Sequence, residues 1–325
     1  MKIAVTGSIA IDQLMAFPGR FTDQLVEGAL DKVSLSFLVE EMHVRRGGTA
    51  ANIAYGLGRL GLTPILVGAV GADFDDHRSW LDRHGVDTKS VHVSRTQHTS
   101  RFLCTTDRAQ NQIASFYAGA MSEAREIELR PVADRVGGLD LVLVAPNDPM
   151  AMVRHTEECR ARGYRFAADP SQQLATMSGE EVRGLVEGAE YLFTNEYETS
   201  LLLKGTGWSA DDVLARVGCW VRTHGGDGVR IDSGTESLRV PAVPAKEVDP
   251  TGIGDGFRAG FLWGLHARLS PERAAQAGCT LATIVLESLG GQEYTVDRGA
   301  FADRVAKTYG GEAAGEIESR LRARY

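Results

Sequence analysis

The stretch Asp249-Pro250-Thr251-Gly252-Ile253-Gly254-Asp255-Gly256-Phe257-Arg258-Ala259-Gly260 places two carboxylates, a hydroxyl and several glycines at the start of an apolar segment. The apolar residues that follow recur at spacings of three and four: Phe257, Phe261, Leu262 and Leu265. This spacing predicts a helix that begins near Gly254 and buries one face. The first N–H groups of a helix have no partner within it and carry the positive end of its dipole, so we expect them to attract an anion.

Asp255 is expected in the first turn of this helix, at the place where an anion would otherwise bind. Gly252 and Gly254 have no side chains and would let a phosphate approach the backbone closely. A carboxylate beside a transferring phosphoryl group is suited to take a proton from an attacking hydroxyl. For any single residue a plainer interpretation is available, in which Asp249 and Thr251 form a turn and Asp255 complements the helix dipole. Together, the residues of the stretch favour phosphoryl transfer.

The composition describes a mildly acidic globular chain. Its 325 residues carry 35 Lys and Arg against 43 Asp and Glu, which gives a net charge of −8. The basic residues are dispersed, which argues against a nucleic-acid or membrane partner, and no apolar stretch is long enough to span a bilayer. The four cysteines are isolated and lack metal-ligand spacing, which favours reduced thiols in a cytoplasmic protein. Met1–Ser8 is interpreted as a buried first strand rather than a signal peptide.

Strands and helices alternate along much of the chain. The expected strands are 3–5, 65–70, 141–145, 166–168, 191–194 and 219–222, and the expected helices include 75–84, 150–162, 179–188 and 271–289. This alternation predicts a parallel sheet that is covered on both faces. Polar clusters follow several strand ends, at Asn147-Asp148, Asp169–Gln173 and Asn195–Glu198, where ligands of parallel sheets bind. A hairpin around Ser233–Thr235 and an amphipathic C-terminal helix complete the expected α/β body.

Three further β segments have no helices between them. They cover 32–46, 100–106 and 112–117, and we assign them to a small lid sheet that stands apart from the α/β body. A lid that excludes water would protect a phosphoryl donor from hydrolysis. Phe37, Phe102 and Phe116 could stack on an aromatic ligand, or they could form the core of the lid or a dimer interface.

Two other segments carry candidate sugar-binding groups. The loop Gly7–Asp12 follows the first strand, so Asp12 is expected either to bind a hydroxyl or to cap the loop. Gly47-Gly48 opens a helix that holds Asn52, whose amide suits sugar hydroxyls. The spelling G-x-G-x-x-G occurs at 56–61, but there it ends a helix and precedes a strand. This order is the reverse of a dinucleotide-binding fingerprint, so a Rossmann oxidoreductase is rejected.

Taken in order, these elements resemble the ribokinase-like (PfkB) family of carbohydrate and nucleoside kinases. The resemblance rests on Asp12, Gly47-Gly48 with Asn52, the N-x-x-E pattern of Asn195 and Glu198, the glycine-rich turn at 223–228, and the stretch Asp249–Gly260. Within the family the chain is most similar to bacterial-type adenosine kinases, through segments 7–10, 33–38, 115–117 and 168–173. The resemblance implies one ribokinase-like domain over 1–325: a Rossmann-like parallel-sheet sandwich with a β lid built from about 13–46 and 97–119.

The resemblance also implies roles for individual residues. Asp255 would be the general base, with the backbone of Gly252, Ile253 and Gly254 stabilising developing charge. The acceptor would be held by residues of two kinds: Asp12, Gly48 and Asn52 at the ribose hydroxyls, and Ser8, Ser36, Gln172, Gln173, Phe102 and Phe116 at the rest of the nucleoside. ATP would be bound by Asn195, Thr223, Gly225, Gly226 and Gly228. Glu198 would orient hydrated Mg²⁺, and Asp249 and Thr251 resemble the potassium site of the family. Gly256 departs from the usual alanine.

The function expected from this reading is transfer of the γ-phosphoryl group of ATP to the 5′-hydroxyl of adenosine, which yields AMP in nucleoside salvage. One alternative keeps the fold but takes ribose, fructose, another nucleoside or a sugar phosphate, with Arg45-Arg46 as a possible second phosphate site. Another is a non-catalytic nucleoside or sugar sensor, against which the intact Asp255 argues. Apolar lid residues such as Leu35, Phe37 and Leu103 favour a homodimer through the lid.

Overall fold

The apolar runs of the sequence form a central eight-stranded sheet. The computed structural model describes residues 1–24, 36–234 and 236–321, and all strands and helices reported below lie within this part of the chain. The strands of the central sheet are β1 (Ile3–Thr6), β4 (Ile65–Val67), β9 (Leu141–Val144), β10 (Phe166–Ala168), β11 (Tyr191–Asn195), β12 (Cys219–Thr223), β13 (Val229–Ser233) and β14 (Glu236–Val240).

The order of these strands is β14-β13-β12-β11-β10-β9-β1-β4. All pairs from β4 to β12 are parallel, whereas β12–β13 and β13–β14 are antiparallel. The chain continues from β1 to β4 on one side and later returns to β9 on the other, so the winding direction changes at β1. Such a switch point is where open α/β sheets bind ligands at their carboxyl edge. The mostly parallel α/β sheet expected from the sequence is confirmed.

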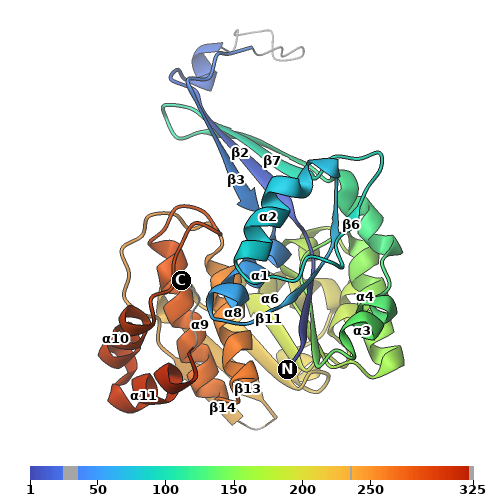
Figure 1. Ribbon diagram of the computed structural model, residues 1–325, viewed down its shortest axis with the longest axis vertical. Helices are drawn as coiled ribbons and strands as arrows, with labels where there is room; N and C mark the ends of the chain where they lie inside the picture. Colours follow the sequence, from blue (N-terminus) through green and yellow to red (C-terminus); the bar gives the residue numbers. More distant parts are fainter. Residues whose placement is uncertain (25–35, 235, 322–325) are drawn as a thin grey trace.

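Helices cover both faces of the sheet (Figure 1). On one face the core includes Ile3, Val5 and Phe193, and on the other it includes Ala4, Val142 and Leu192, as the two-residue period of a strand requires. The first face is covered by α1 (Thr49–Arg59), α2 (Asp75–Arg83), α8 (Ile253–His266), α9 (Pro271–Leu286), α10 (Arg298–Tyr309) and α11 (Gly311–Arg320). The second face is covered by α3 (Leu129–Val136), α4 (Pro149–Arg162), α5 (Gly179–Val186), α6 (Glu196–Thr206) and α7 (Ala210–Leu214).

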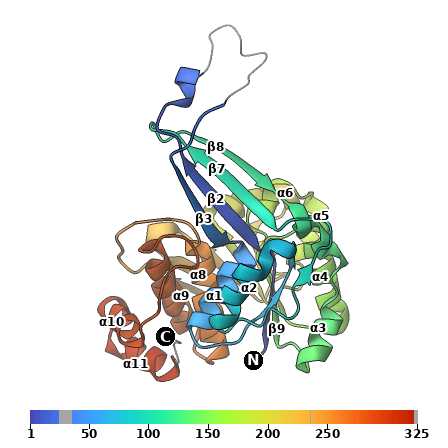
Figure 2. The same cartoon turned by 45° about the horizontal axis from the view of Figure 1, so that its top comes forward.

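A second, four-stranded sheet rises from the carboxyl edge of the central sheet (Figures 1 and 2). We call it the small sheet, and its strands are β3 (Glu41–Gly47), β2 (Ala10–Ala16), β7 (Ser100–Thr106) and β8 (Gln112–Tyr117), in spatial order. β2 follows almost directly on β1, and β3 leads directly into α1. The small sheet is thus anchored at the switch point. A separate pair, β5 (Ala69–Val70) and β6 (His92–Val93), lies in the α/β body.

Three expectations about local structure were wrong. Asp12 lies within β2 and not in a loop, because β2 pairs with both β3 and β7 along its length. The strand expected over 32–46 is confined to Glu41–Gly47; residues 25–35, with Val33 and Leu35, lie outside the described residues. The single C-terminal helix is two helices, α10 and α11, separated at Gly310, whose φ of 93° a helix does not accommodate.

Within the described residues, no helix is long and apolar enough to cross a membrane. The four cysteines, which are all buried, form no disulfide.

Candidate active site

A cavity of about 760 Å³ lies at the carboxyl edge of the central sheet. Its walls come from the segments that follow β10, β11 and β12 and from the N-terminus of α8. The structure brings together there the following predicted site residues: Gln172, Asn195, Glu198, Thr223, Gly225, Gly226, Gly228, Gly252, Ile253, Gly254 and Asp255. They are far apart in the sequence and meet because parallel strands end at one edge.

Helix α8 presents its N-terminus to this cavity. It begins at Ile253, and Gly252 adopts the left-handed conformation before it, with φ of 80°. No described side chain caps this terminus. Apart from the Ile253 N–H, which donates to the Pro250 oxygen at 3.5 Å, the first N–H groups are therefore available to an anion. Gly256 has a packing reason to depart from alanine, since a Cβ there would lie 2.8 Å from the Cγ2 atom of Val285 on α9.

Asp255 lies in the first turn of α8 and is half-buried. The Nδ2 group of Asn52, on α1, donates a hydrogen bond of 2.8 Å to its Oδ2 atom. Burial raises the pKa of Asp255 to about 7, while this hydrogen bond and the charge of Arg258 oppose the rise. A carboxyl with a pKa near neutrality is suited to accept a proton during a reaction and release it afterwards.

Arg258 is a site residue that the sequence reading overlooked. It is only 7% exposed, and its guanidinium pairs with Asp169 through Nε–Oδ2 and Nη2–Oδ1 distances of 2.5 and 2.6 Å. Burial raises the pKa of Asp169 to about 6 although Arg258 lowers it. The sequence did contain a signal: Arg258 is the single charged residue in the apolar run from Phe257 to Leu265. An arginine buried there would need an acidic partner.

Asn195 and Glu198 form the N-terminal capping box of α6. The Oδ1 atom of Asn195 accepts from the Glu198 N–H at 2.8 Å, and the Oε2 atom of Glu198 accepts from the Asn195 N–H at 2.7 Å. The hydroxyl of Ser171 donates to the other carboxylate oxygen at 3.0 Å. The N-x-x-E pattern therefore has a structural role, and it also lines the cavity.

The cavity offers few carboxylates that could bind a magnesium ion. Among the described residues, no group of three or more His, Cys, Asp and Glu side chains is placed to bind a metal. Mg²⁺ commonly keeps several waters and binds substrate phosphates with one or two carboxylates. The carboxylate of Glu198 at the cavity wall fits that kind of site.

The cavity also has an apolar part beside the turn that follows β12. Thr223 ends β12, and the turn that follows contains Gly228, whose φ is 91° and whose Cβ would lie 2.1 Å from the Val240 oxygen. This turn connects the antiparallel strands β12 and β13, and its glycines also line the cavity. The apolar residues nearby are Val243, Pro244, Ala245, Ala282 and Leu286.

Residues from all four strands form a row on one face of the small sheet. Asp12 is in register with Arg45 and with Phe102, and Phe102 is in register with Phe116. Residues in register on neighbouring strands share a face. Burial raises the pKa of Asp12 to about 6, with Arg45 opposing the rise and Asp249 adding to it. Asp12 and both phenylalanines thus belong to the face that meets the Asp249 loop.

Four predicted acceptor residues are placed differently. The hydroxyl of Ser8 accepts from the Thr49 N–H at 3.0 Å, and Gly48 lies against the backbone of Ser8 and Ile9. The Nε2 group of Gln173 donates to the Asn147 oxygen at 2.6 Å, and its Oε1 atom accepts from Thr176. The polar side chains of Ser8 and Gln173 thus have partners within the protein.

Ser36 is exposed and outside any strand. Its neighbour Phe37 packs against Phe17 and Phe21 with ring centroids 4.7 and 5.3 Å apart. Phe37 therefore belongs to a core of the small sheet itself, and the structure does not bring Ser36 to the cavity lining.

Asp249 has partners that the sequence did not indicate. Its Oδ2 atom accepts from Arg45 Nη1 and from the Gly290 N–H, each at 2.9 Å, and its Oδ1 atom accepts from the Thr251 N–H. Although partial burial raises its pKa, the hydrogen bonds from Thr251 and Gly290 and the charge of Arg45 hold it below the usual value. A guanidinium therefore contacts the carboxylate that was expected to bind potassium.

Comparisons with known proteins agree with this geometry. The model of the pfkB family of carbohydrate kinases matches residues 5–297. A nucleoside kinase of Methanothermobacter thermautotrophicus is 30% identical over 280 residues, which cover 85% of this chain and 90% of that protein.

Two solved structures of a nucleoside kinase from Burkholderia thailandensis are also similar to this chain, each at 33% identity. The complex with inosine has a TM-score of 0.82 and covers 95% of this chain and 98% of that one. The complex with ADP and inosine has a TM-score of 0.81, with coverage of 95% and 96%.

Proposed function

We propose, from the premise that this chain belongs to the pfkB family of carbohydrate kinases, that it phosphorylates the 5′-hydroxyl of a purine nucleoside, with adenosine as the acceptor and ATP as the donor. At the coarser level, the chain is an ATP-dependent nucleoside or sugar kinase of this family. The inosine bound to the Burkholderia protein supports a purine nucleoside as acceptor.

The position of Asp255 is the observation that carries the proposal. Its half-buried carboxylate lies in the first turn of α8, next to N–H groups that no described side chain caps. A hydroxyl bound beside it gives its proton to the carboxylate while its oxygen attacks the γ-phosphorus, and the bond from that phosphorus to the bridging oxygen of ATP breaks. The helix N-terminus stabilises the charge on the transferring group.

The donor phosphates would lie between the α8 N-terminus and the wall formed by Asn195, Glu198 and Thr223. Mg²⁺, when bound, neutralises phosphate charge and would be oriented there by Glu198 through water. The residues Gly225, Gly226 and Gly228 would leave room for ATP beside the apolar end of the cavity. The contact of Arg45 with Asp249 already provides a positive charge where K⁺ was expected, so the proposal does not require that ion.

The acceptor side favours a nucleoside over a free sugar. Phe102 and Phe116 lie in the same row as Asp12, and Phe116 is 53% exposed, so it has surface to offer to a flat base. Arg45 and Arg46 are not available for a second phosphate, since Arg45 pairs with Asp249 and Arg46 pairs with Asp76 at 2.7 Å. Ribose, fructose and other nucleosides remain the alternatives within the family.

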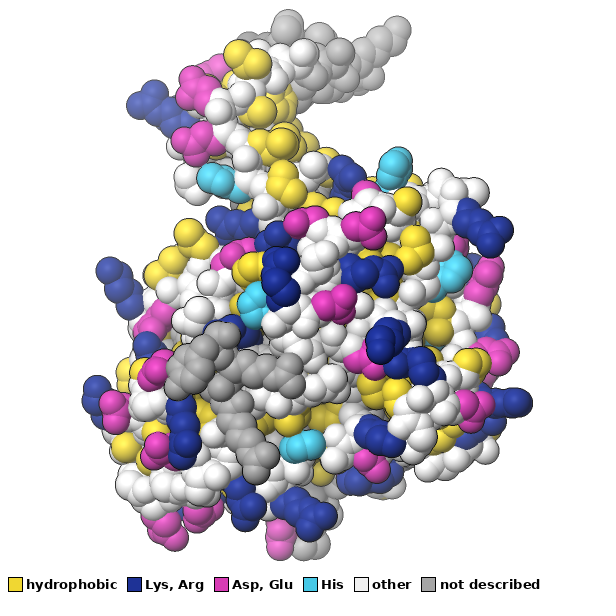
Figure 3. All heavy atoms as spheres, viewed as in Figure 1, with side chains coloured by type: hydrophobic (Ala, Val, Ile, Leu, Met, Phe, Trp, Pro, Cys, Tyr) yellow, Lys and Arg dark blue, Asp and Glu magenta, His cyan; other side chains and the backbone are white. Residues whose placement is uncertain are grey.

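We also propose that the small sheet is a lid, built from about 13–46 and 97–119, and that two copies of the chain associate through its outer face. On the face opposite Asp12 the register places Met42 with Ile113 and Val44 with Leu103. Met42, Val44 and Ile113 are 57%, 56% and 46% exposed. Figure 3 shows hydrophobic side chains along this narrow part of the molecule. Light scattering should give a dimer mass, and a monomer mass would contradict this.

An ATP-consumption assay tests the function. We expect the highest kcat/KM with adenosine or inosine among a panel that also contains guanosine, ribose, fructose and fructose 6-phosphate. Preference for ribose or fructose would establish a sugar kinase instead. Tight binding of a nucleoside without turnover of any compound would establish a sensor and overturn the proposal.

A further inference from the structure

A chain of hydrogen bonds runs from Asp255 to a buried histidine outside the cavity. Asn52 donates to Asp255 at 2.8 Å, the Nε2 group of Gln292 donates to the Asn52 Oδ1 atom at 2.9 Å, and the His77 Nε2 atom lies 3.1 Å from the Gln292 Oε1 atom. Asn52, Gln292 and His77 are 6%, 1% and 3% exposed. The chain therefore links α8, α1, the segment after α9, and α2 through groups that water scarcely reaches.

Each bond in this chain has one permitted direction. An ionised Asp255 can only accept, so Asn52 must present its Nδ2 group to it and its Oδ1 atom to Gln292. Gln292 must then donate its Nε2 group and accept at Oε1, so His77 must carry its proton on Nε2. Burial lowers the pKa of His77 to about 4, so this ring is neutral at physiological pH. Its Nδ1 atom has no hydrogen-bond partner among the described residues, as expected if it carries no proton.

Neighbouring residues hold in place the segments that bear these hydrogen-bonded side chains. Arg46, on β3, pairs with Asp76 beside His77 and with Glu293 beside Gln292, at 2.7 and 3.5 Å. Gly291 lies so close to Asn52 that a Cβ there would be 2.7 Å from the Asn52 Nδ2 atom. The amide of Asn52 is thus enclosed on one side and hydrogen-bonded at both ends.

We propose that Gln292 and His77 are positioning residues, which hold the Asn52 amide with its Nδ2 group toward Asp255 and thereby orient the base. This inference rests on the proposed function for the role of Asp255. Without Gln292, the Asn52 Oδ1 atom loses its donor, and only the bond to Asp255 holds the amide in this orientation. If the amide turned, its oxygen would face the carboxylate, which would lose a donor and gain a repulsive neighbour.

The consequence is a measurable change in the titration of Asp255. The hydrogen bond from Asn52 lowers its pKa, so losing that bond should raise the value above about 7. The ionisable groups that act on Asp255 from the surrounding elements, or on which it acts, are Asp12, Asp169, Arg258 and Tyr294. None of them is changed by a substitution at Gln292. Turnover should therefore require a higher pH in such a variant.

Gln292→Met tests the proposal because it keeps the length of the side chain, adds no charge and cannot donate a hydrogen bond. We expect kcat to fall roughly tenfold to a hundredfold, the scale of a lost hydrogen bond to a charged group. KM should change little, and the acidic limb of the kcat profile should move up by about one pH unit. The matched control is Gln276→Met, since Gln276 is also a buried, hydrogen-bonded glutamine, 4% exposed, on α9 away from the chain. The control should keep the wild-type pH profile.

Two variants of His77 provide a second test that does not depend on how Gln292→Met folds. His77→Gln keeps an N–H donor near the position of Nε2, and His77→Leu does not. We expect His77→Leu to reduce kcat about threefold to tenfold, because one bond further from the base is lost, and His77→Gln to restore most of the activity. Equal activity of the two variants would overturn the proposal.

A carboxyl-carbon NMR titration of Asp255 separates this inference from the proposed function, because it needs no turnover. If wild-type protein phosphorylates none of the acceptors, the proposed function fails, yet a raised Asp255 pKa in Gln292→Met would still support the network. If wild-type protein is active and Gln292→Met has the wild-type profile and pKa, the inference fails alone. A lower melting temperature with an unchanged pH profile would assign Gln292 a purely structural role and would also overturn it.

Discussion

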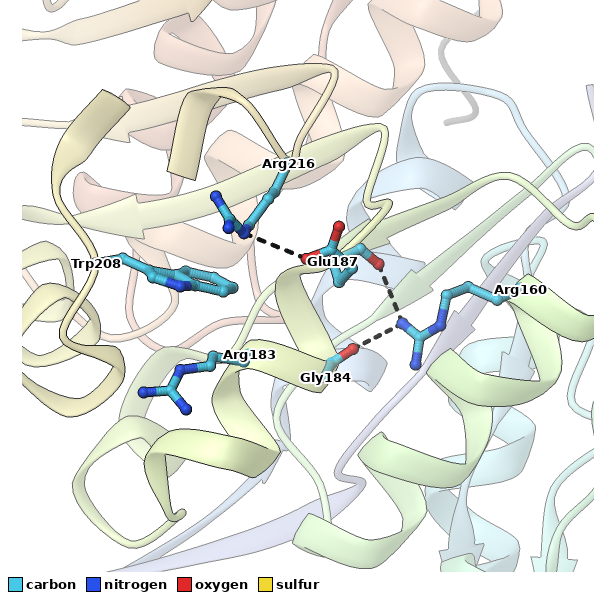
Figure 4. Close-up of a pocket in the computed structure, with 6 residues that line it drawn as sticks. All are labelled: Arg160, Arg183, Gly184, Glu187, Trp208 and Arg216. Carbon is cyan, nitrogen blue, oxygen red and sulfur yellow. Dashed lines mark hydrogen bonds and ion pairs between the residues drawn. The ribbon is translucent and has the colours of Figure 1, made fainter. Parts of the chain in front are cut away.

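Two cavities at opposite edges of the central sheet differ in whether their charged and polar groups already have partners in the protein. The candidate active site lies where the parallel strands end, and a second cavity of about 580 Å³ lies where they begin, lined by segments that precede β10, β11 and β12 (Figure 4). Its residues are Arg160, Arg183, Gly184, Glu187, Trp208 and Arg216. Three arginines beside a tryptophan would suit an anionic ligand by composition alone.

The arginines of the second cavity are already engaged. Arg160 donates to the carbonyl oxygens of Gly184 and Glu187 at the end of α5, at 2.7 and 3.1 Å. Arg183 donates to the Thr206 oxygen at the end of α6. Arg216 pairs with Glu187 at 3.4 Å and stacks on Trp208 at 4.6 Å. These contacts satisfy carbonyl groups at helix C-termini, where cations are stabilising.

The cavity of the candidate active site has the reverse arrangement: some of its polar groups are not matched by partners within the described residues. Its helix N-terminus has no cap among the described side chains, and burial raises the pKa values of Asp255 and Asp169 to about 7 and 6. Ionised carboxylates in this environment cost stability unless a ligand or a reaction uses them. A cavity of adequate size is therefore weak evidence of function, whereas unsatisfied donors beside destabilised charges are stronger evidence.

The largest effect should come from Asp255→Asn. This substitution removes the base while it preserves the shape of the side chain, so kcat should fall by about a hundredfold or more. ATP binding, measured by calorimetry, should persist because the α8 N-terminus is unchanged. Turnover near the wild-type value would show that Asp255 is not the base and would remove this difference between the two cavities.

Gly254→Ala should have a smaller effect on activity. A Cβ at this position would lie 2.7 Å from the Nη1 atom of Arg258, and that guanidinium cannot move freely because it is buried against Asp169. We expect kcat/KM to fall about tenfold, as a small misplacement at the anion site would produce. Gly184→Ala is the matched control in the second cavity, because its Cβ would meet no described heavy atom within 4 Å. Equal activity of the two variants would contradict the comparison.

The pH dependence of stability should reveal the partly desolvated charge of Asp255. Because burial raises its folded-state pKa to about 7 from an ordinary value of 3.8, the free energy of unfolding should fall as pH rises between those values. Asp255→Asn lacks this loss, so its stability relative to wild type should be about 3–4 kcal/mol greater at pH 8 than at pH 4. Urea unfolding at both pH values provides the measurement. A stability difference between the two proteins that does not depend on pH would mean that burial does not raise the pKa of Asp255.

Arg216→Ala should produce the smallest effect. The pair with Glu187 and the stacking on Trp208 are both partly exposed, so we expect a loss of stability of about 0.5–1 kcal/mol. The value of kcat should not change, because Arg216 lies at the edge of the sheet opposite the active site. A clear loss of activity in a protein that unfolds normally would indicate that the second cavity influences the first.

The stretch Asp249–Gly260 by itself predicted the start of α8, its anion-binding character and the candidate base, because helix periodicity and glycine content are local properties. The alternation of strands and helices likewise predicted the parallel sheet and the edge at which the polar clusters meet. The tertiary structure alone decided the rest. The pairing of Arg45 with Asp249, the burial of Arg258 against Asp169 and the chain from His77 to Asn52 join segments up to 240 positions apart. No local pattern encodes such contacts, since they depend on how helices and the small sheet pack at the edge of the central sheet.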